Sequence, residues 1–599
     1  MFNLQEWIHK FEVGEGVRHI KLAAALLGLL ALTAIYDIRE FKNFATQEAM
    51  DSAQLARNIA EGHGFTTQFI RPLSILLMQQ QMPPGIPVLK DPHPDLANPP
   101  VYPLLLAALM KVLPFDFQVN TAAVGPSSHQ PEVLIALFNQ LLFFIGIFVL
   151  FRVALRLFDR AVAWTSAIVF AGADLLWRFS VSGLSTIWLI LLFLLITWCL
   201  VSMEQSHREG QRSNTWFLAM AAAVGILTGL GAMTRYSFAW LIVPIAAFIV
   251  LFFGQRRFVL AGVAVATCVV MMVPWLARNF SVSGTFFGIE GYALYQGTEQ
   301  FPDSRLERSL NSDFETELEG VGAVAILRKL LVNTATIVTN DLPKLTGTWV
   351  SGLFLVSLLV PFRNPALTRL RWFTLMVIAV LVVAQALART HLTSDVPEVN
   401  SENLLALASP LVFVFGTGLF FVLLDQIEFS FTPLRPVVAA TFPVVICAPL
   451  LLTLLPPRSY PLAWPPYFPS RIQVVGSWFG KNELMMSDMP WAVAWYGNRK
   501  CVWTTLDAPL ETARAGGADF FAIYDFQKPI AGLYLTTLTS NAAIFAAAAK
   551  APSVAWSEFM LGSIFKTNVP AGFPLKYAIT AFIDDGQLFL ADRPRWSSK

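Results

Sequence analysis

The chain has 599 residues, of which 55% are hydrophobic and only 14% are charged, and its formal net charge is +2. Soluble proteins carry about 25% charged residues, so the composition excludes an ordinary soluble protein. The near-neutral net charge gives no indication of a nucleic-acid partner. Apolar runs of bilayer-spanning length recur over the first 455 positions, which predicts a polytopic α-helical membrane protein that contacts membrane lipids.

Eleven candidate membrane spans follow one another along the chain. They are 20–36, 133–151, 161–177, 183–203, 215–233, 236–254, 258–276, 345–362, 372–388, 403–424 and 433–455. With the N-terminus on the cytoplasmic side, basic stretches such as FRVALRLFDR and EQSHREGQRSN fall in inner loops, as the positive-inside rule requires. The apolar segments 101–115 and 323–338 contain basic residues, and counting 101–115 as a span would move the basic loops outside. We therefore predict interfacial helices there.

This topology places three regions on the outer side of the membrane: a first loop at 37–132, a second loop at 277–344, and the tail at 457–599. The tail alternates β-rich runs (RIQVVGSWF, AVAWYG, CVWTTL, DFFAIYDF, QLFLAD) with helix-like stretches (LETARAGGA, NAAIFAAAAK). We predict a membrane module at 1–456 and a small extracytoplasmic α/β domain at 457–599.

The stretch 47–72 reads QEAMDSAQLARNIAEGHGFTTQFIRP, which predicts a short helix, a Gly-His-Gly turn and a basic, strand-like tail. One stripe of the helix is polar (Gln47, Asp51, Gln54, Asn58, Glu61), and another is small (Ala49, Ala53, Ala56, Ala60) and suited to close packing. Glu48 lies beside Asp51 on the neighbouring row. The spacing alone favours a solvated helix face. The alternative is that Asp51 or Glu48 acts as a general base.

Arginines are the second group of candidates, because several lie on the outer side, where the positive-inside rule disfavours them in short loops. They are Arg71, Arg235 in GAMTRYSF, Arg278 beside Asn279 in VPWLARNFSVSG, and Arg389 near His391 in LARTHLTSD. Arginine binds phosphate through paired hydrogen bonds. A single one is equally well explained by contact with lipid headgroups, but several together favour an anionic ligand.

Two further polar residues are weaker candidates. His93 lies in LKDPHPDLANPP, together with Asn98. Asp174, near the outer end of a span, is explained by an intrahelical pair with Arg178. The sequence contains no convincing set of metal ligands and no disulfide pattern among its four cysteines.

The opening stretch, NPPVYPLLLAALMKVL, GLGAMTRYSFAWLIVPI and VPWLARNFSVSGTFFG occur in the order seen in GT-C fold glycosyltransferases. Over residues 20–455 the chain resembles bacterial relatives of the protein O-mannosyltransferase and aminoarabinose transferase group. The resemblance implies a protein of the bacterial cytoplasmic (inner) membrane. It also implies inverting transfer of a sugar from a polyprenyl-phosphate donor to an acceptor on the outer face, which could be a lipid, a glycan or a protein.

The resemblance assigns the roles of the candidate residues. An acid in the first outer loop activates the acceptor hydroxyl, which makes Asp51 the first candidate and Glu48 the second. Cations stabilise the leaving phosphate, and Arg71, Arg235 and Arg278 are the candidates. The accessory candidates are His93, Asn98, Asn279, Arg389 and His391. A divalent cation could share this work, as it does in some relatives.

The chain departs from the family pattern at two places. Many relatives have His or Lys before the Pro-Pro pair where this chain has Asn98, and many have Arg-Tyr where it has Glu402 and Asn403. These departures leave open a different donor or acceptor, or a catalytically inactive assembly subunit. A transporter or flippase of a lipid-linked sugar is the other alternative, although the spans lack the deep polar residues that transport requires. In the tail, Asp488, Trp495 and Tyr496 resemble a strand-turn feature of appended domains, for which core packing is the favoured explanation.

Overall fold

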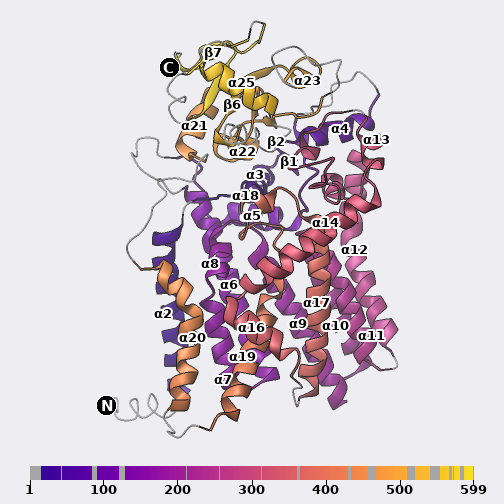
Figure 1. Ribbon diagram of the computed structural model, residues 1–599, viewed down its shortest axis with the longest axis vertical. Helices are drawn as coiled ribbons and strands as arrows, with labels where there is room; N and C mark the ends of the chain where they lie inside the picture. The colour runs from indigo at the N-terminus through magenta and orange to yellow at the C-terminus, as the bar shows by residue number, and fades with distance from the viewer. Residues whose placement is uncertain are drawn as a thin grey trace.

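The structure is a computed structural model that describes residues 15–41, 43–83, 89, 91–119, 129–210, 212–254, 256–311, 313–360, 364–428, 434–455, 467–508, 520–539, 554–565, 569–570, 572–579 and 586–597. Long helices form a bundle at one end of the molecule, and shorter helices and a β-sheet form the other end (Figure 1). The predicted helical membrane protein with a mixed α/β region is therefore what the chain folds into.

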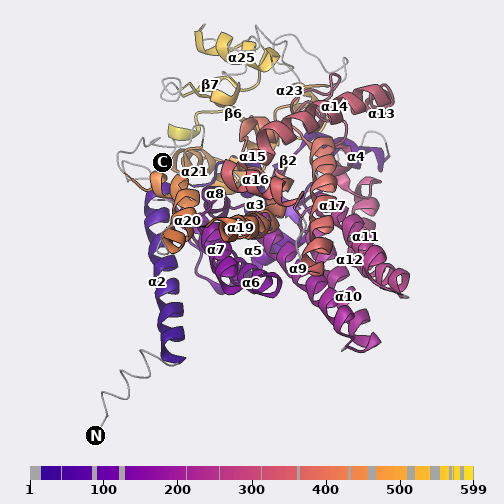
Figure 2. The ribbon, with the colours of Figure 1, turned by 60° about the horizontal axis from the view of Figure 1, so that its bottom comes forward.

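The bundle contains the long apolar segments of the sequence. Its helices are α2 (Glu15–Glu40), α6 (Gln130–Leu157), α7 (Arg160–Ala171), α8 (Asp174–Val181), α9 (Thr186–Glu209), α10 (Asn214–Ala232), α11 (Ile242–Phe252), α12 (Arg257–Ser283), α16 (Thr348–Ser357), α17 (Pro365–Ala388), α19 (Ser409–Gln426) and α20 (Leu434–Thr453). Within the described ranges, seven helical segments are long and apolar enough to cross a membrane. Figure 2 shows α2 and α20 side by side at the edge of the bundle.

Three predicted spans differ in detail from continuous helices. The span at 161–177 is broken into α7 and α8, which are bent by 52° and would make an eighth span if taken together. A Cβ atom on Gly172, at the break, would lie 2.1 Å from Cys447 Sγ of α20, so the glycine permits this close contact. The span at 236–254 begins with a 3₁₀ turn, η1 (Tyr236–Leu241), and the span at 345–362 contains only the short helix α16. The total of eleven spans stays a prediction.

The first outer loop folds as its sequence predicts. Its elements are α3 (Gln47–Ala60), β1 (Thr66–Thr67), β2 (Phe69–Ile70), α4 (Pro72–Gln80), β3 (His93–Pro94) and α5 (Val101–Val112), the last within the predicted interfacial helix. Gly62 and Gly64 have φ values of 85° and 72°, which allows the chain to turn after α3. The alanine stripe of α3 is buried and packs on α5 and on a helix of the tail.

The second outer loop contains short helical pieces: η2 (Gly288–Tyr292), η3 (Leu306–Arg308), α13 (Phe314–Glu319), α14 (Ala323–Thr336), η4 (Ile337–Asp341) and α15 (Leu342–Lys344). The predicted interfacial helix corresponds to α14. Its Lys329 is buried and donates hydrogen bonds to backbone carbonyls of the same loop. Between α17 and α19 the chain forms α18 (Leu392–Asp395) and η5 (Leu404–Ala408).

The tail folds around a six-stranded mixed sheet. It contains α21 (Pro469–Ser477), β4 (Leu484–Ser487), α22 (Pro490–Gly497), β5 (Cys501–Trp503), α23 (Phe520–Tyr524), β6 (Ile530–Leu535), α25 (Val554–Phe565), β7 (Tyr577–Ala578), β8 (Leu588–Ala591) and η8 (Arg595–Ser597). The strand order is β2-β5-β4-β6-β8-β7; the first four strands are parallel, and β8 is antiparallel to both of its neighbours, β6 and β7. The described part of the tail thus contains both helices and strands.

Three of the predicted strands in the tail are wrong. RIQVVGSWF, AVAWYG and DFFAIYDF form α21, α22 and α23 instead. The cause is tertiary: α22 packs against α3 and α21 and is buried on all sides, so its sequence has no helical periodicity to distinguish it from a buried strand. CVWTTL and QLFLAD contain β5 and β8, as predicted. LETARAGGA and NAAIFAAAAK lie outside the described residues.

The sheet joins the tail to the first outer loop. Its edge strand β2 belongs to that loop and pairs in parallel with β5, with Phe69 opposite Cys501 and Ile70 opposite Val502. The second loop also contacts the tail, through an ion pair of 2.5 Å between Arg305 and Asp507. The division of the chain at 456/457 stays a prediction, but a strand from the first loop completes the sheet of the tail.

Candidate active site

A cavity lies where the first and second outer loops meet the ends of the bundle helices. It is lined by one side of α3, the segment 97–99, the turn 234–237, parts of 289–307 and residues from 388–404. The first and last of these segments are more than 300 positions apart in the sequence. The cavity contains Asp51, Glu48, Arg71, Asn98 and Arg235 from the predicted candidates.

Asp51 is central to the polar contacts of the cavity. The residue is only 1% exposed, and its Oδ2 accepts hydrogen bonds of 2.9 Å from both Arg71 Nη2 and Asn98 Nδ2. Its Oδ1 has no hydrogen-bond partner among the described residues. The neighbouring members of the same stripe, Gln54 and Asn58, are also buried. The solvated helix face that the spacing favoured is therefore wrong, because α3 is covered on this side by the two outer loops.

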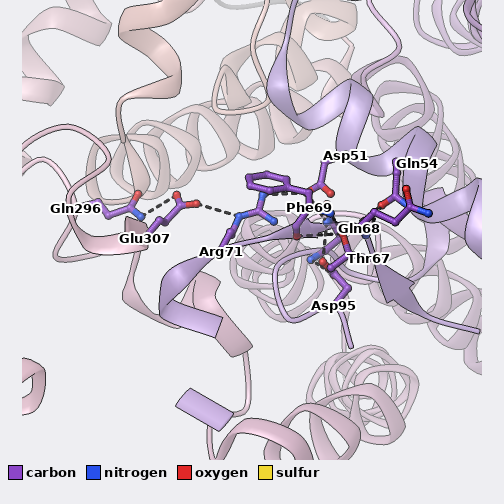
Figure 3. Close-up of polar contacts among 10 residues, drawn as sticks. Asp51, Gln54, Thr67, Gln68, Phe69, Arg71, Asp95, Gln296 and Glu307 are labelled. Atoms are coloured by element: carbon purple, nitrogen blue, oxygen red, sulfur yellow. Dashed lines mark hydrogen bonds and ion pairs between the residues drawn. The ribbon is translucent and has the colours of Figure 1, made fainter. Parts of the chain in front are cut away.

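Arg71 connects the two outer loops. It follows β2 directly, and its guanidinium lies 3.9 Å from the centre of the Phe69 ring. Nη2 binds Asp51, while Nε donates a 3.0 Å hydrogen bond to Glu307 Oε2, which Gln296 holds from the other side (Figure 3). Burial opposes the charge of Arg71, but Asp51 and Glu307 outweigh it and keep the pKa of the guanidinium above its ordinary value. Arg71 thus fixes the Asp51 carboxylate.

Asn98 orients Asp51 from a second direction. Its backbone N–H donates to Asp95 Oδ2 at 2.8 Å, and its side-chain amide donates to Asp51. Burial and the Asp51 carboxylate raise the pKa of Asp95 above its ordinary value. In this chain the position before the Pro-Pro pair therefore contributes an amide that holds the carboxylate rather than a cation.

Arg235 is a second arginine in the cavity, and its surroundings are different. The residue precedes η1, and Nη2 makes only a long contact of 3.4 Å with Ser185 Oγ. Nη1 is buried and has no hydrogen-bond partner in the described part of the chain. Burial lowers the pKa of Arg235 to about 10, against the effect of Glu48, Glu290 and Glu402, so the side chain is still charged at neutral pH. A buried donor without a partner is costly unless a ligand satisfies it.

Comparisons with known proteins identify the fold. No family model and no curated protein sequence matches the chain. Its structure is similar to the archaeal oligosaccharyltransferase AglB from Archaeoglobus fulgidus, in complex with an inhibitory peptide and a dolichol-phosphate, with a TM-score of 0.53 and 11% identity over 90% of this chain and 72% of AglB. It is also similar to ArnT from Cupriavidus metallidurans in the apo state, with a TM-score of 0.51 and 10% identity over 96% of this chain and 98% of ArnT. The chain has the GT-C fold.

In this GT-C fold the cavity contains more acidic than basic side chains. Five carboxylates line it, from Glu48, Asp51, Glu290, Glu307 and Glu402, against the two arginines. Glu48 Oε1 accepts from the backbone N–H of Ser401 at 3.1 Å. The Glu402 carboxylate accepts from the Thr390 backbone N–H at 2.9 Å and from the hydroxyls of Thr390 and Thr393, while burial raises its pKa.

Five predicted candidates of this GT-C chain do not line the cavity. Arg278 Nη1 donates to the Asp95 carbonyl and to Asn279, and Asn279 in turn donates to the Tyr236 hydroxyl. His93 is buried and its Nε2 lies 2.9 Å from Ser74 Oγ; burial lowers its pKa to about 4. The remaining two are Arg389, 3.7 Å from Asp341, and His391, beside the Trp503 ring.

The acids near the bundle and in the tail have structural partners. Arg178 forms an ion pair with Glu398, and its charge also acts on Asp174, the partner expected from the sequence. Asp488 is buried and its Oδ2 accepts hydrogen bonds from the backbone and side chains of Thr536 and Thr539. Trp495 is buried as well and donates to Glu132 at 2.7 Å, which agrees with core packing.

A divalent cation is the cofactor that the comparisons raise. A second structure of the Archaeoglobus fulgidus oligosaccharyltransferase, in complex with Zn and sulfate, has a TM-score of 0.52 to this chain and 11% identity over 88% of this chain and 70% of that one. Protein metal sites need several convergent ligands. Within the described ranges, no three His, Cys, Asp or Glu side chains converge in such a way.

Glu290, Glu307 and Asp95 are the residues that sequence reasoning did not select. Glu290 and Glu307 lie in the second outer loop, where nothing in the local pattern distinguishes them from surface acids. The sequence offered an indication only for Asp95, because it lies in the same LKDPHPDLANPP stretch as the candidates His93 and Asn98.

Proposed function

We propose that the protein is an inverting glycosyltransferase that moves a sugar from a polyprenyl-phosphate donor to an acceptor hydroxyl on the outer face of the membrane. One observation carries the proposal. In a GT-C fold, a buried carboxylate with a free oxygen (Asp51 Oδ1) and a buried guanidinium with a free N–H (Arg235 Nη1) line the same cavity. A base and an unpaired cation are what nucleophilic displacement of a phosphate requires.

Asp51 is the proposed general base. Its Oδ2 is occupied by Arg71 and Asn98, so Oδ1 is the oxygen left to take the proton from the acceptor hydroxyl. As the proton leaves, the acceptor oxygen forms a bond to the anomeric carbon on the face opposite the phosphate. The bond from the anomeric carbon to the phosphate oxygen breaks, and its electron pair stays on polyprenyl phosphate. Attack from the opposite face inverts the configuration.

Arg235 is the proposed contact for the departing phosphate. The leaving group gains negative charge in the transition state, and a positioned guanidinium in a site shielded from water stabilises that charge. Arg71 has a different proposed role, because two carboxylates already bind it; it positions Asp51 and links it to Glu307. Arg278 lies behind the Asp95 carbonyl, so we assign it to the framework of the first loop.

The comparisons support this choice of substrate class. The AglB structure contains a dolichol-phosphate, a polyprenyl-type lipid phosphate, and an inhibitory peptide. A transferase acting on lipid-phosphate donors is therefore the function that agrees with the fold, with the unpaired arginine and with the carboxylate.

Incubation of the purified protein with labelled undecaprenyl-phosphate sugars and a membrane extract tests it. We expect label to move to a new molecule only when protein, donor and extract are all present. A parallel measurement in proteoliposomes follows movement of the labelled donor between leaflets. Leaflet exchange without transfer would replace the proposal by a flippase, and neither activity with any donor would favour an assembly subunit.

A further inference from the structure

Glu290 differs from the other carboxylates of the cavity. Glu48, Asp51, Glu307 and Glu402 each accept hydrogen bonds from protein groups. In the described parts of the chain, the Glu290 side chain forms neither a hydrogen bond nor an ion pair, although it is exposed and lines the cavity. Among the five acids of the cavity, Glu290 is therefore the one whose whole carboxyl group remains available for a ligand.

The backbone that carries Glu290 is firmly held on one side. Gly288 has a φ of 58°, and a Cβ atom at this position would lie 2.1 Å from the Leu96 carbonyl oxygen, so only glycine allows the approach. The next residue, Ile289, is buried and its N–H donates to that same carbonyl at 3.1 Å. This contact places Glu290 close to the segment that carries Asn98, and hence close to Asp51.

The other side of the segment is held by Lys329 of α14. Its Nζ donates to the carbonyl oxygens of Ala293 at 2.9 Å, of Leu294 at 3.2 Å and of Gln296 at 2.5 Å. Buried charged hydrogen bonds of this kind are among the strongest in proteins. The Glu290 carboxylate is therefore free while its backbone is anchored on both sides, which is the arrangement expected of a binding residue rather than of a loose surface acid.

From this geometry we infer that the Glu290 carboxylate binds hydroxyl groups of the transferred sugar and so selects the donor. The inference rests on the proposed function. A carboxyl group offers no positive charge to a phosphate, so in this inference Glu290 faces the part of the donor that carries hydroxyl groups, while Arg235 binds the phosphate next to it. The cavity walls that surround the carboxyl group and the charge of Glu307 raise the pKa of Glu290 to about 8. The group can therefore accept or donate hydrogen bonds near neutral pH.

Two dissociation constants measured on the full-length protein in detergent test the inference. One is for undecaprenyl phosphate alone, and the other is for each of a panel of undecaprenyl-phosphate sugars carrying mannose, glucose, galactose or arabinose. We expect wild type to prefer at least one sugar donor over the bare lipid phosphate. In Glu290→Gln that preference should fall about tenfold. At pH 7, binding of undecaprenyl phosphate itself should be unchanged, because the Glu290 carboxyl group is mostly neutral there.

Glu299→Gln is the matched control. Glu299 lies in the same loop but outside the cavity, where its side chain is 79% exposed and paired with Arg328, so its preference ratio should equal that of wild type. Two results would overturn the inference and leave the proposed function unaffected. One is a folded Glu290→Gln protein with the same preference for sugar donors over undecaprenyl phosphate as wild type. The other is a wild-type protein that prefers none of the sugar donors in the panel. Failure of wild type to bind undecaprenyl phosphate would overturn the proposed function, and the inference with it.

Discussion

Replacement of Asp51 by asparagine tests the centre of the proposed chemistry while it preserves the shape of the site. The amide keeps one oxygen that can accept from Arg71 or Asn98, but it cannot take a proton from the acceptor. General bases contribute about 100- to 10,000-fold to rate, so the initial rate of sugar transfer should fall by at least about 100-fold. The loss should appear in kcat rather than in donor binding, because Arg235 is untouched.

The cost in stability is bounded by the contacts of Arg71. Stripping one partner from a fully buried ion pair costs about 3–5 kcal/mol. Here Arg71 Nε keeps its 3.0 Å bond to Glu307, so the smaller loss of one charged hydrogen bond applies, about 1.5–3 kcal/mol. Thermal unfolding in detergent should therefore show a folded Asp51→Asn protein with a lowered melting temperature.

The control for this experiment lies at the end of the same helix. Glu61 follows α3, its side chain is 40% exposed, and it pairs with Arg57 on the surface. Glu61→Gln should leave the transfer rate within about twofold of wild type. Refutation would be a folded Asp51→Asn protein that transfers sugar at more than a third of the wild-type rate. The base would then have to be sought at Glu48, which lines the same cavity.

Three further substitutions or conditions have expected outcomes. In equilibrium titrations, Arg235→Gln should weaken the binding of undecaprenyl phosphate about 10- to 100-fold. Arg235→Lys should recover part of this affinity, because lysine restores the positive charge but not the forked geometry of the guanidinium. Equal binding by wild type and both variants would show that Arg235 does not contact the phosphate. Between pH 7 and pH 9 the Glu290 carboxyl changes from mostly neutral to mostly anionic, since its pKa is raised to about 8, and the added negative charge should weaken wild-type binding of undecaprenyl phosphate roughly threefold to tenfold. Glu290→Gln should show a smaller change over this range, and identical pH profiles would contradict the assignment. Phe69→Ala should lower the free energy of unfolding by about 3–5 kcal/mol, because the ring is fully buried and contacts Trp491, Trp503 and the guanidinium of Arg71. Chemical denaturation measures this loss. A loss below about 1 kcal/mol would show that β2 contributes little to the stability of the sheet.

The helical membrane fold could be predicted because its signals are local. Apolar runs, the glycines at 62 and 64, and the polar and small stripes of α3 are properties of neighbouring residues, and they appear in the structure at the predicted places. The buried helix α22 was mistaken for a strand because burial on every side removes the periodicity that distinguishes the two. The order of the motifs along the chain was enough to indicate the GT-C fold.

The sequence by itself determined which polar residues stand in the loops between the helices, and Asp51 and Arg235 were among the candidates it offered. Tertiary structure alone decided how those side chains are used. It buried the polar face of α3, bound Arg71 between two carboxylates, left Arg278 and Arg389 outside the cavity, and brought Glu290 into it. The physical reason is that the desolvation and the hydrogen-bond partners of a side chain depend on segments hundreds of positions away in the sequence. A local sequence pattern does not show which of these segments will be in contact.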